Sequence, residues 1–72
     1  MITKSMINNW FMYHPPENEE DIKKYQVIRD AGKKFAQVIV ENTPESADQT
    51  AAIRKIREAV MTANAAIACK GK

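Results

Sequence analysis

Two stretches of this chain repeat apolar residues every three or four positions, and a four-residue break at 42–45, with Pro44 in it, separates them. The first stretch, 18–41, carries Ile22, Tyr25, Ile28, Phe35, Val38 and Ile39. The second, 46–69, carries Ile53, Ile56, Val60, Ala63 and Ile67. Such spacing places the apolar side chains on one face of an α-helix. It predicts an all-α chain with an antiparallel two-helix hairpin.

Local signals agree with this reading. The acidic run at 17–21 favours a helix start, because carboxylates stabilise the positive end of a helix. Ser46 is a suitable N-cap, and Gln49 three residues later completes a capping-box pattern. Gly71 is expected to end the second helix. Gly32 lies inside the first helix, where glycine costs roughly 1 kcal/mol relative to alanine. Its presence indicates a close approach by another helix or by a ligand.

The N-terminal segment, residues 1–16, is different in kind. Residues 1–10 fit a helical turn or two, although Asn8 and Asn9 resist helix formation. Residues 11–16, which we call the strap, are expected to be extended, because its two prolines fix φ and lack a donor N–H. The strap and its neighbour Trp10 hold most of the large rings. It is either a lid on the core or a platform on which other rings stack.

The chain is a single domain of 72 residues, and its one cysteine, Cys69, rules out a disulfide within the chain. Each predicted helix also has a second apolar shoulder that one partner helix would not cover: Val27 and Val40, then Ala59 and Met61. The missing core predicts a homo-oligomer. In such an assembly we expect Trp10 and Phe11 to turn inward as a lid and Tyr13 to face a pocket between protomers.

Several classes of protein are disfavoured. A net charge of +2 is small for a protein that coats a nucleic-acid duplex, and no apolar run reaches membrane-spanning length. The N-terminus does not resemble a secretory signal, so a cytoplasmic protein is expected. Phosphate-binding glycine loops, HExxH, CxxC and serine-elbow motifs are missing, and one His with one Cys is a thin ligand set. We expect no enzyme activity, no metal and no cofactor.

A few polar residues deserve a functional reading. Arg29 and Lys33 lie one turn apart beside the apolar stripe, where an Arg can hold a phosphate while its stem packs. Arg54 and Arg57 are more simply read as partners of Glu58 and nearby acids. The remaining lysines of the first helix, Lys23, Lys24 and Lys34, read as a solvated face.

Two further side chains have open alternatives. Asn64 stands among alanines on a buried-looking face, so it needs partners, either across an oligomer or on the edge of a base or ribose. His14 beside two prolines reads better as a packing or hydrogen-bonding residue than as a general base. Rings, cations and an amide together suit a small unpaired nucleotide, but a core lid with a salt-bridged surface explains most of the same residues.

Five motifs, in this order, resemble a phage helical-hairpin family, the anti-CBASS and Thoeris anti-defense sponges. They are Phe11-x-Tyr13-His14-Pro15-Pro16, Tyr25-x-x-Ile28-Arg29-x-Ala31, Phe35-Ala36-x-x-Ile39, Pro44-x-Ser46 and Glu58-Ala59-Val60-Met61-x-Ala63-Asn64-Ala65-Ala66-Ile67-Ala68. They span residues 11–68. The short chain, with no room for an added β-element, is most similar to the anti-CBASS branch.

The resemblance implies a protein of the host cell cytoplasm that binds cyclic di- or trinucleotides, or cyclic ADP-ribose isomers, without cleaving them. It implies a homohexamer with messenger pockets between protomers and a separate three-fold pocket for trinucleotides. Tyr13 would stack on a base, Arg29 would contact phosphate and Asn64 would border a pocket. Cys69 stands where relatives often have an Arg, so Lys70 or Arg54 would have to supply that charge.

The candidate ligand-binding residues are therefore Tyr13, His14, Arg29, Lys33, Asn64 and Lys70. The resemblance adds Lys24, because the family's motifs do not fix the alignment through residues 16–24. Two other readings remain. The chain is a helical interaction module whose apolar shoulders bind a host protein, or it binds single-stranded nucleic acid, which the small net charge disfavours.

Overall fold

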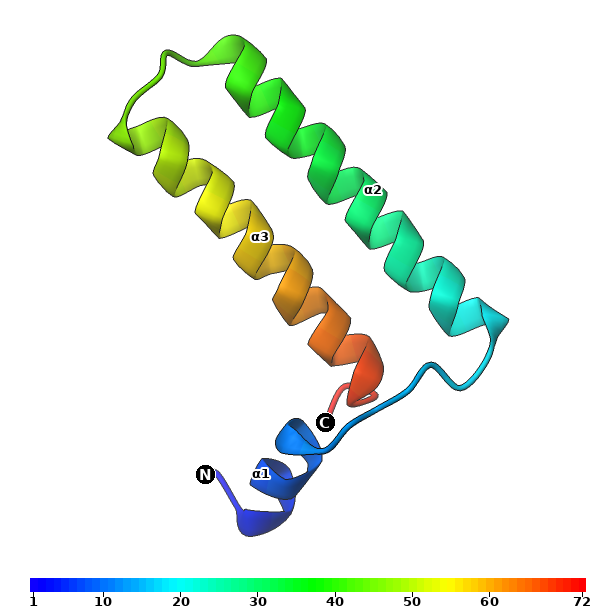
Figure 1. The fold of residues 1–72 in the computed structure, drawn as a ribbon. Coiled ribbons are helices and arrows are strands. Elements are labelled where there is room, and N and C mark those ends of the chain that lie inside the picture. The colour runs from blue at the N-terminus through cyan, green and yellow to red at the C-terminus, as the bar shows by residue number, and fades with distance from the viewer.

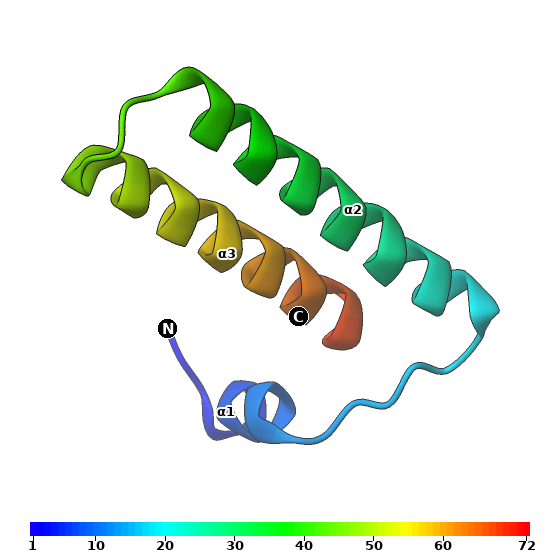
Figure 2. The ribbon, with the colours of Figure 1, turned by 45° about the horizontal axis from the view of Figure 1, so that its top comes forward.

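The computed structural model describes all 72 residues and contains three helices and no strand. A two-turn helix, α1 (Lys4–Phe11), is followed by the long helices α2 (Glu19–Asn42) and α3 (Ala47–Ala68). Helices α2 and α3 run antiparallel along their whole length, and α1 lies beyond the end where α3 finishes (Figures 1 and 2). The predicted all-α hairpin is confirmed.

Each helix begins where a polar side chain caps it. Thr3, Asn18 and Ser46 accept hydrogen bonds from the backbone N–H three residues later, at 2.9–3.2 Å. The two long helices therefore start one residue later than the predicted 18 and 46. Only half of the predicted capping box forms, because the Gln49 side chain donates to the Thr43 carbonyl and hydroxyl oxygens instead and holds the turn closed.

The end of α3 is a Schellman-type turn. The N–H of Gly71 donates to the Ala66 carbonyl at 2.9 Å and that of Lys70 donates to the Ile67 carbonyl at 3.2 Å. Lys70, with φ +55°, takes the left-handed position at which glycine is usual, and Gly71, with φ +75°, follows it. The helix thus ends at Ala68, one residue before the predicted limit.

The contact between α2 and α3 is closest at Gly32. A Cβ placed on Gly32 would lie 2.5 Å from Cγ2 of Val60, closer than real carbon atoms approach. The glycine in the middle of the helix is therefore explained by another helix, one of the two alternatives that the sequence left open. This contact also sets the register of the hairpin.

No residue of the single chain is fully buried. Large apolar side chains on both long helices stay about half exposed, among them Ile22, Val27, Phe35, Val40 and Met61. The radius of gyration is 15.2 Å, whereas a compact domain of this length has about 11 Å. The hairpin by itself is an open structure with apolar surface on both sides of the helix contact.

Gly32→Ala tests the helix contact. The added Cβ gains roughly 1 kcal/mol of helix propensity, but the stiff Val60 side chain cannot move away, so we expect a net loss of about 1–3 kcal/mol in the free energy of unfolding. Denaturant melts at one protein concentration measure it. In a Val60→Ala background the same change should cost nothing, and an equal loss in both backgrounds would contradict the contact.

Candidate functional site

The structure anchors the N-terminal segment to the end of α3 through polar contacts. Trp10 Nε1 donates to the Lys72 carbonyl at 3.1 Å, and the Cys69 thiol lies 3.9 Å from the Asn9 carbonyl oxygen. Lys70 Nζ forms the only ion pair of the chain, with Glu17 at 3.0 Å. Residues 10, 17 and 69–72 therefore hold both ends of the extended segment in place.

His14 lies inside this anchor. Its Nε2 is 2.6 Å from the Asn9 carbonyl oxygen, so this ring nitrogen carries a proton and donates, and the ring is half buried. The hydrogen-bonding reading of His14 is confirmed. Because Nε2 is engaged within the chain, only Nδ1 is left for another partner.

The rings around the strap are placed differently from the prediction. Phe11 ends α1, so the extended segment begins at Met12, and the Phe11 side chain is 84% exposed. The single chain leaves Phe11 uncovered, because α1 packs little against the hairpin; that Phe11 turns inward in an assembly stays a prediction. Trp10 is 41% exposed and is partly covered through its contact with the C-terminal end.

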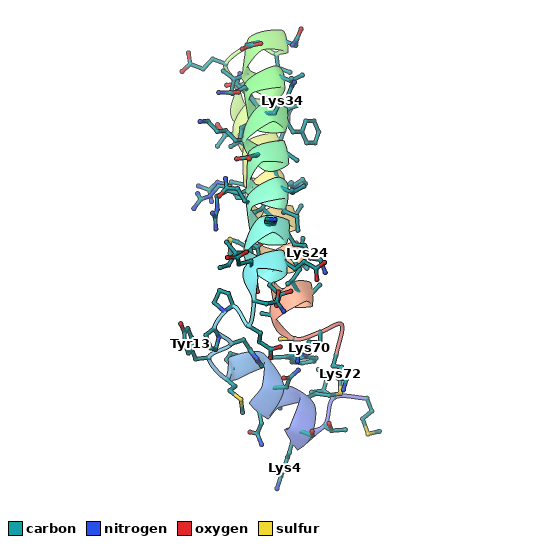
Figure 3. The ribbon with its side chains drawn as sticks, turned by 90° about the vertical axis from the view of Figure 1, so that its right-hand side faces the viewer. Lys4, Tyr13, Lys24, Lys34, Lys70 and Lys72 are labelled. Carbon is teal, nitrogen blue, oxygen red and sulfur yellow. The ribbon has the colours of Figure 1, made fainter.

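Tyr13, like Phe11, is a ring that the structure presents to solvent. It is 83% exposed and projects from the extended segment at the end of the molecule that also holds Lys70, far from Lys34 (Figure 3). His14 follows it and is tied to Asn9, and two prolines come next, so the backbone that carries the ring is held in place. An anchored backbone with an exposed ring suits stacking, because little conformational freedom is lost on binding.

The other candidate residues are spread along the hairpin. His14 and Lys70 line one small depression of about 70 Å³ with Tyr25. Lys24 lies on α2 beside Val27 and Ile67 at another depression. Arg29 donates through Nη1 to Gln26 Oε1 at 3.2 Å. Tyr13 lines neither the depression at His14 nor the groove between the long helices. One chain thus does not bring the stacking ring together with the cations of α2.

Asn64 lacks a hydrogen-bond partner in the single chain, as expected for a residue whose partner lies on another chain or on a ligand. Its Oδ1 atom is covered, and no donor reaches it within the chain. Gly32 lies against Val60, and the two helices are antiparallel. Asn64, four residues after Val60, therefore lies at the level of Ile28, four residues before Gly32. An uncompensated buried amide oxygen costs about 1–3 kcal/mol, so a donor from outside this chain would stabilise it.

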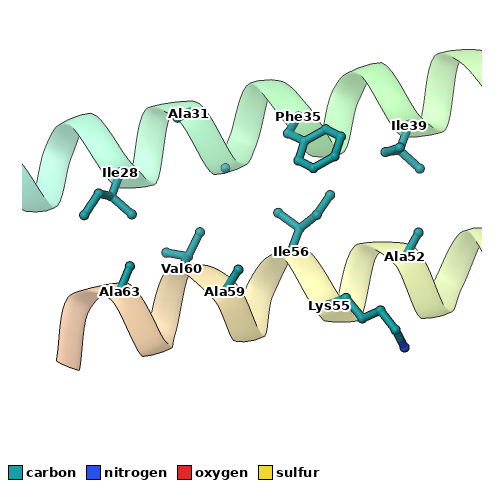
Figure 4. Close-up of a pocket in the computed structure, with 11 residues that line it drawn as sticks. Ile28, Ala31, Phe35, Ile39, Ala52, Lys55, Ile56, Ala59, Val60 and Ala63 are labelled. Carbon is teal, nitrogen blue, oxygen red and sulfur yellow. The ribbon is translucent and has the colours of Figure 1, made fainter. Parts of the chain in front are cut away.

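The largest depression of the molecule is an apolar groove of about 540 Å³ between α2 and α3. Ile28, Phe35 and Ile39 point into it from α2, and Ala52, Ile56, Ala59 and Ala63 face it from α3 (Figure 4). Lys55 is at its rim, with the ammonium directed away from the opposite helix (Figure 4). Nothing polar lines the floor, so this groove suits an apolar partner surface and offers no group for catalysis.

The position of one cation, Arg57, was not predicted from the sequence. Arg57 was expected to pair with an acid, but no acid lies within ion-pair distance of it or of Arg54. The neighbouring Glu58 is the next residue along the helix, and side chains at i and i+1 do not face each other. Arg57 instead lines a depression together with Lys33 of α2. Lys33 and Arg57 lie close in sequence to Gly32 and Val60, and this position is the signal from which their shared depression could have been predicted.

No three His, Cys, Asp or Glu side chains lie together in a metal-binding arrangement. None of the three helices is both long and apolar enough to cross a bilayer.

A comparison with family models decides the family. The model described as "Acb2/Tad1, hairpin domain" matches residues 4–68. This chain belongs to that family. The Acb2/Tad1 proteins are the anti-CBASS and anti-Thoeris sponges, so the resemblance seen in the five motifs is confirmed. The searches of curated proteins and of solved structures matched nothing.

Replacing His14 tests the anchor. His14→Ala removes the donor to Asn9, which should cost about 1 kcal/mol and loosen α1. We expect faster amide hydrogen exchange in residues 4–11 and no change in the middle of α2 and α3. His14→Gln, which can keep an N–H donor, should recover part of the protection. Unchanged exchange in the alanine variant would show that this hydrogen bond does not hold the segment.

Proposed function

We propose that this protein is a phage anti-defense sponge. It binds cyclic oligonucleotide messengers in the host cell cytoplasm, releases them unchanged, and so lowers the free messenger that activates CBASS effectors. The messengers we consider are cyclic dinucleotides such as cyclic GMP–AMP, cyclic trinucleotides and cyclic ADP-ribose isomers. The observation that carries the proposal is the match to the sponge family over residues 4–68.

The geometry of Tyr13 supports this proposal. An exposed aromatic ring on a held backbone offers a stacking face to any base, and base–aromatic stacking is worth roughly 1–3 kcal/mol. Cations without an acidic partner stand further along α2 at Arg29 and Lys33. They would meet the phosphates. Since Tyr13 and these cations line no shared depression in one chain, the proposed pocket takes the ring from one protomer and cations from another.

Self-association follows from the same surface argument. With no residue fully buried and an apolar groove of about 540 Å³ open between the helices, a second hairpin would gain about 25 cal/mol for each Å² of apolar surface that it covers. We propose a homo-oligomer, a hexamer as in the anti-CBASS branch, in which this groove lies at an interface. Asn64 Oδ1 would then find its donor on a neighbouring chain or on the ligand.

The apolar groove also favours a second candidate function. A helix of a host protein could occupy it, in which case this chain would be an interaction module that remains a monomer or dimer until its partner is present. Light scattering on the purified protein separates the two, because a stable hexamer without any partner argues against the interaction module.

Phe35→Asp tests the oligomer. Phe35 is 56% exposed and lines the groove, so a carboxylate there should disrupt packing between chains more than packing within the hairpin. We expect size-exclusion chromatography with light scattering to show a hexamer for the unaltered protein and smaller species for the variant. Lys34→Asp, which introduces the same charge outside the groove, is the matched control. If the variant keeps the full assembly, the interface between chains is not at this groove.

Tyr13→Ala tests the messenger site. Loss of one stacking face should weaken binding of cyclic GMP–AMP by roughly ten- to hundredfold, while Tyr13→Phe keeps the face and should bind much more tightly than the alanine variant. Titration calorimetry across a nucleotide panel measures this, and chromatography of nucleotide released by heat checks that it is unchanged. Absence of binding to every panel member would sink the proposal, and altered nucleotide would make the protein an enzyme.

A further inference from the structure

On the side of the hairpin away from the apolar groove, the two long helices form a furrow. Its two adjoining parts, of about 360 and 330 Å³, share Lys33, Ala36 and Ile53. The furrow and the apolar groove have only the line of helix contact in common, at Gly32, Ile56 and Val60. What covers one of them therefore need not cover the other.

Lys33 and Arg57 stand on opposite walls of the first part of the furrow. Lys33 follows Gly32 by one residue on α2, and Arg57 precedes Val60 by three residues on α3. Because the helices are antiparallel and Gly32 lies against Val60, the two cations lie at nearly the same level along the hairpin. Neither has an acidic partner, since the chain's single ion pair joins Lys70 to Glu17. No carboxylate lines this part; the one acid of the furrow, Glu41, lines the other part.

The floor between the two cations is apolar. Ala36, Ile53, Val60 and Met61 form it, and the small side chain of Ala36 leaves room above it. Two like charges on the walls of one depression repel each other, and an anion placed between them relieves that repulsion. A guanidinium with a nearby ammonium is a good receptor for a phosphate group, the first bidentately and the second as a point charge.

The geometry points to an anion-binding site between Lys33 and Arg57 that takes an organic phosphate ester: the phosphate bridges the two cations, and the apolar or aromatic body of the ester rests on Ala36, Ile53 and Met61. The site belongs to one hairpin and contains no part of the Tyr13 strap. It shares Lys33 with the messenger pocket proposed above, and Arg57 and the apolar floor make it a second ligand site.

Phenyl phosphate and inorganic phosphate are the probes that test it. Both are titrated into the full-length protein in its native assembly, and chemical shifts of the Arg57 and Lys33 side chains are followed by NMR. We expect both side chains to respond and phenyl phosphate to bind more tightly than inorganic phosphate, because only the ester covers the apolar floor. Equal affinities for the two probes would contradict the proposed contact between the body of the ester and the apolar floor.

Two variants and two controls test which residues bind the phosphate. Arg57→Gln and Lys33→Ala should each weaken phenyl phosphate binding by about tenfold, the effect of losing a charged hydrogen bond. Lys34→Ala, which removes the next lysine along α2 from outside the furrow, should bind as the unaltered protein does. An equal loss in Lys34→Ala would show general charge attraction, and unchanged binding in Arg57→Gln would overturn the site. Tyr13→Ala should still bind phenyl phosphate, so that failure of the messenger proposal and failure of this one are seen separately.

Discussion

The close contact of α2 with α3 at Gly32 is the constraint on which the rest of this structure depends. Because Val60 occupies the space that a Cβ at residue 32 would need, the two backbones approach closely there and the register of the whole hairpin is set. That one line of contact divides the remaining surface into an apolar groove on one side and a furrow with cations on the other. Both surfaces are consequences of two helices packing with nothing above or below them.

The N-terminal segment depends on a different kind of interaction. It is held by hydrogen bonds and one ion pair to the last residues of α3, with little apolar packing behind it. Polar contacts of this kind fix direction and contribute modestly to stability. They give Tyr13 a defined position without covering it, which is what a stacking residue requires. Trp10 and His14 help to build that support through their hydrogen bonds to Lys72 and Asn9.

Much of the fold could be predicted, because helix periodicity and capping are local. The Ser46 cap lies where the sequence places it, and each predicted helix limit is within one residue of the observed one. The candidate site was less predictable. Arg57 was assigned to an ion pair because its neighbour in sequence is an acid. That error comes from reading proximity along the chain as contact in space.

The amino-acid sequence by itself determined the three helices, the hairpin and the family, since these follow from residue spacing, caps and an ordered set of motifs. Only the tertiary structure decided which of the available side chains are engaged. It ties His14 to Asn9 and Lys70 to Glu17, leaves Tyr13 exposed, and sets Lys33 opposite Arg57. The physical reason is that a side chain's partners depend on the register between helices, and the Gly32–Val60 contact sets that register through space rather than along the chain.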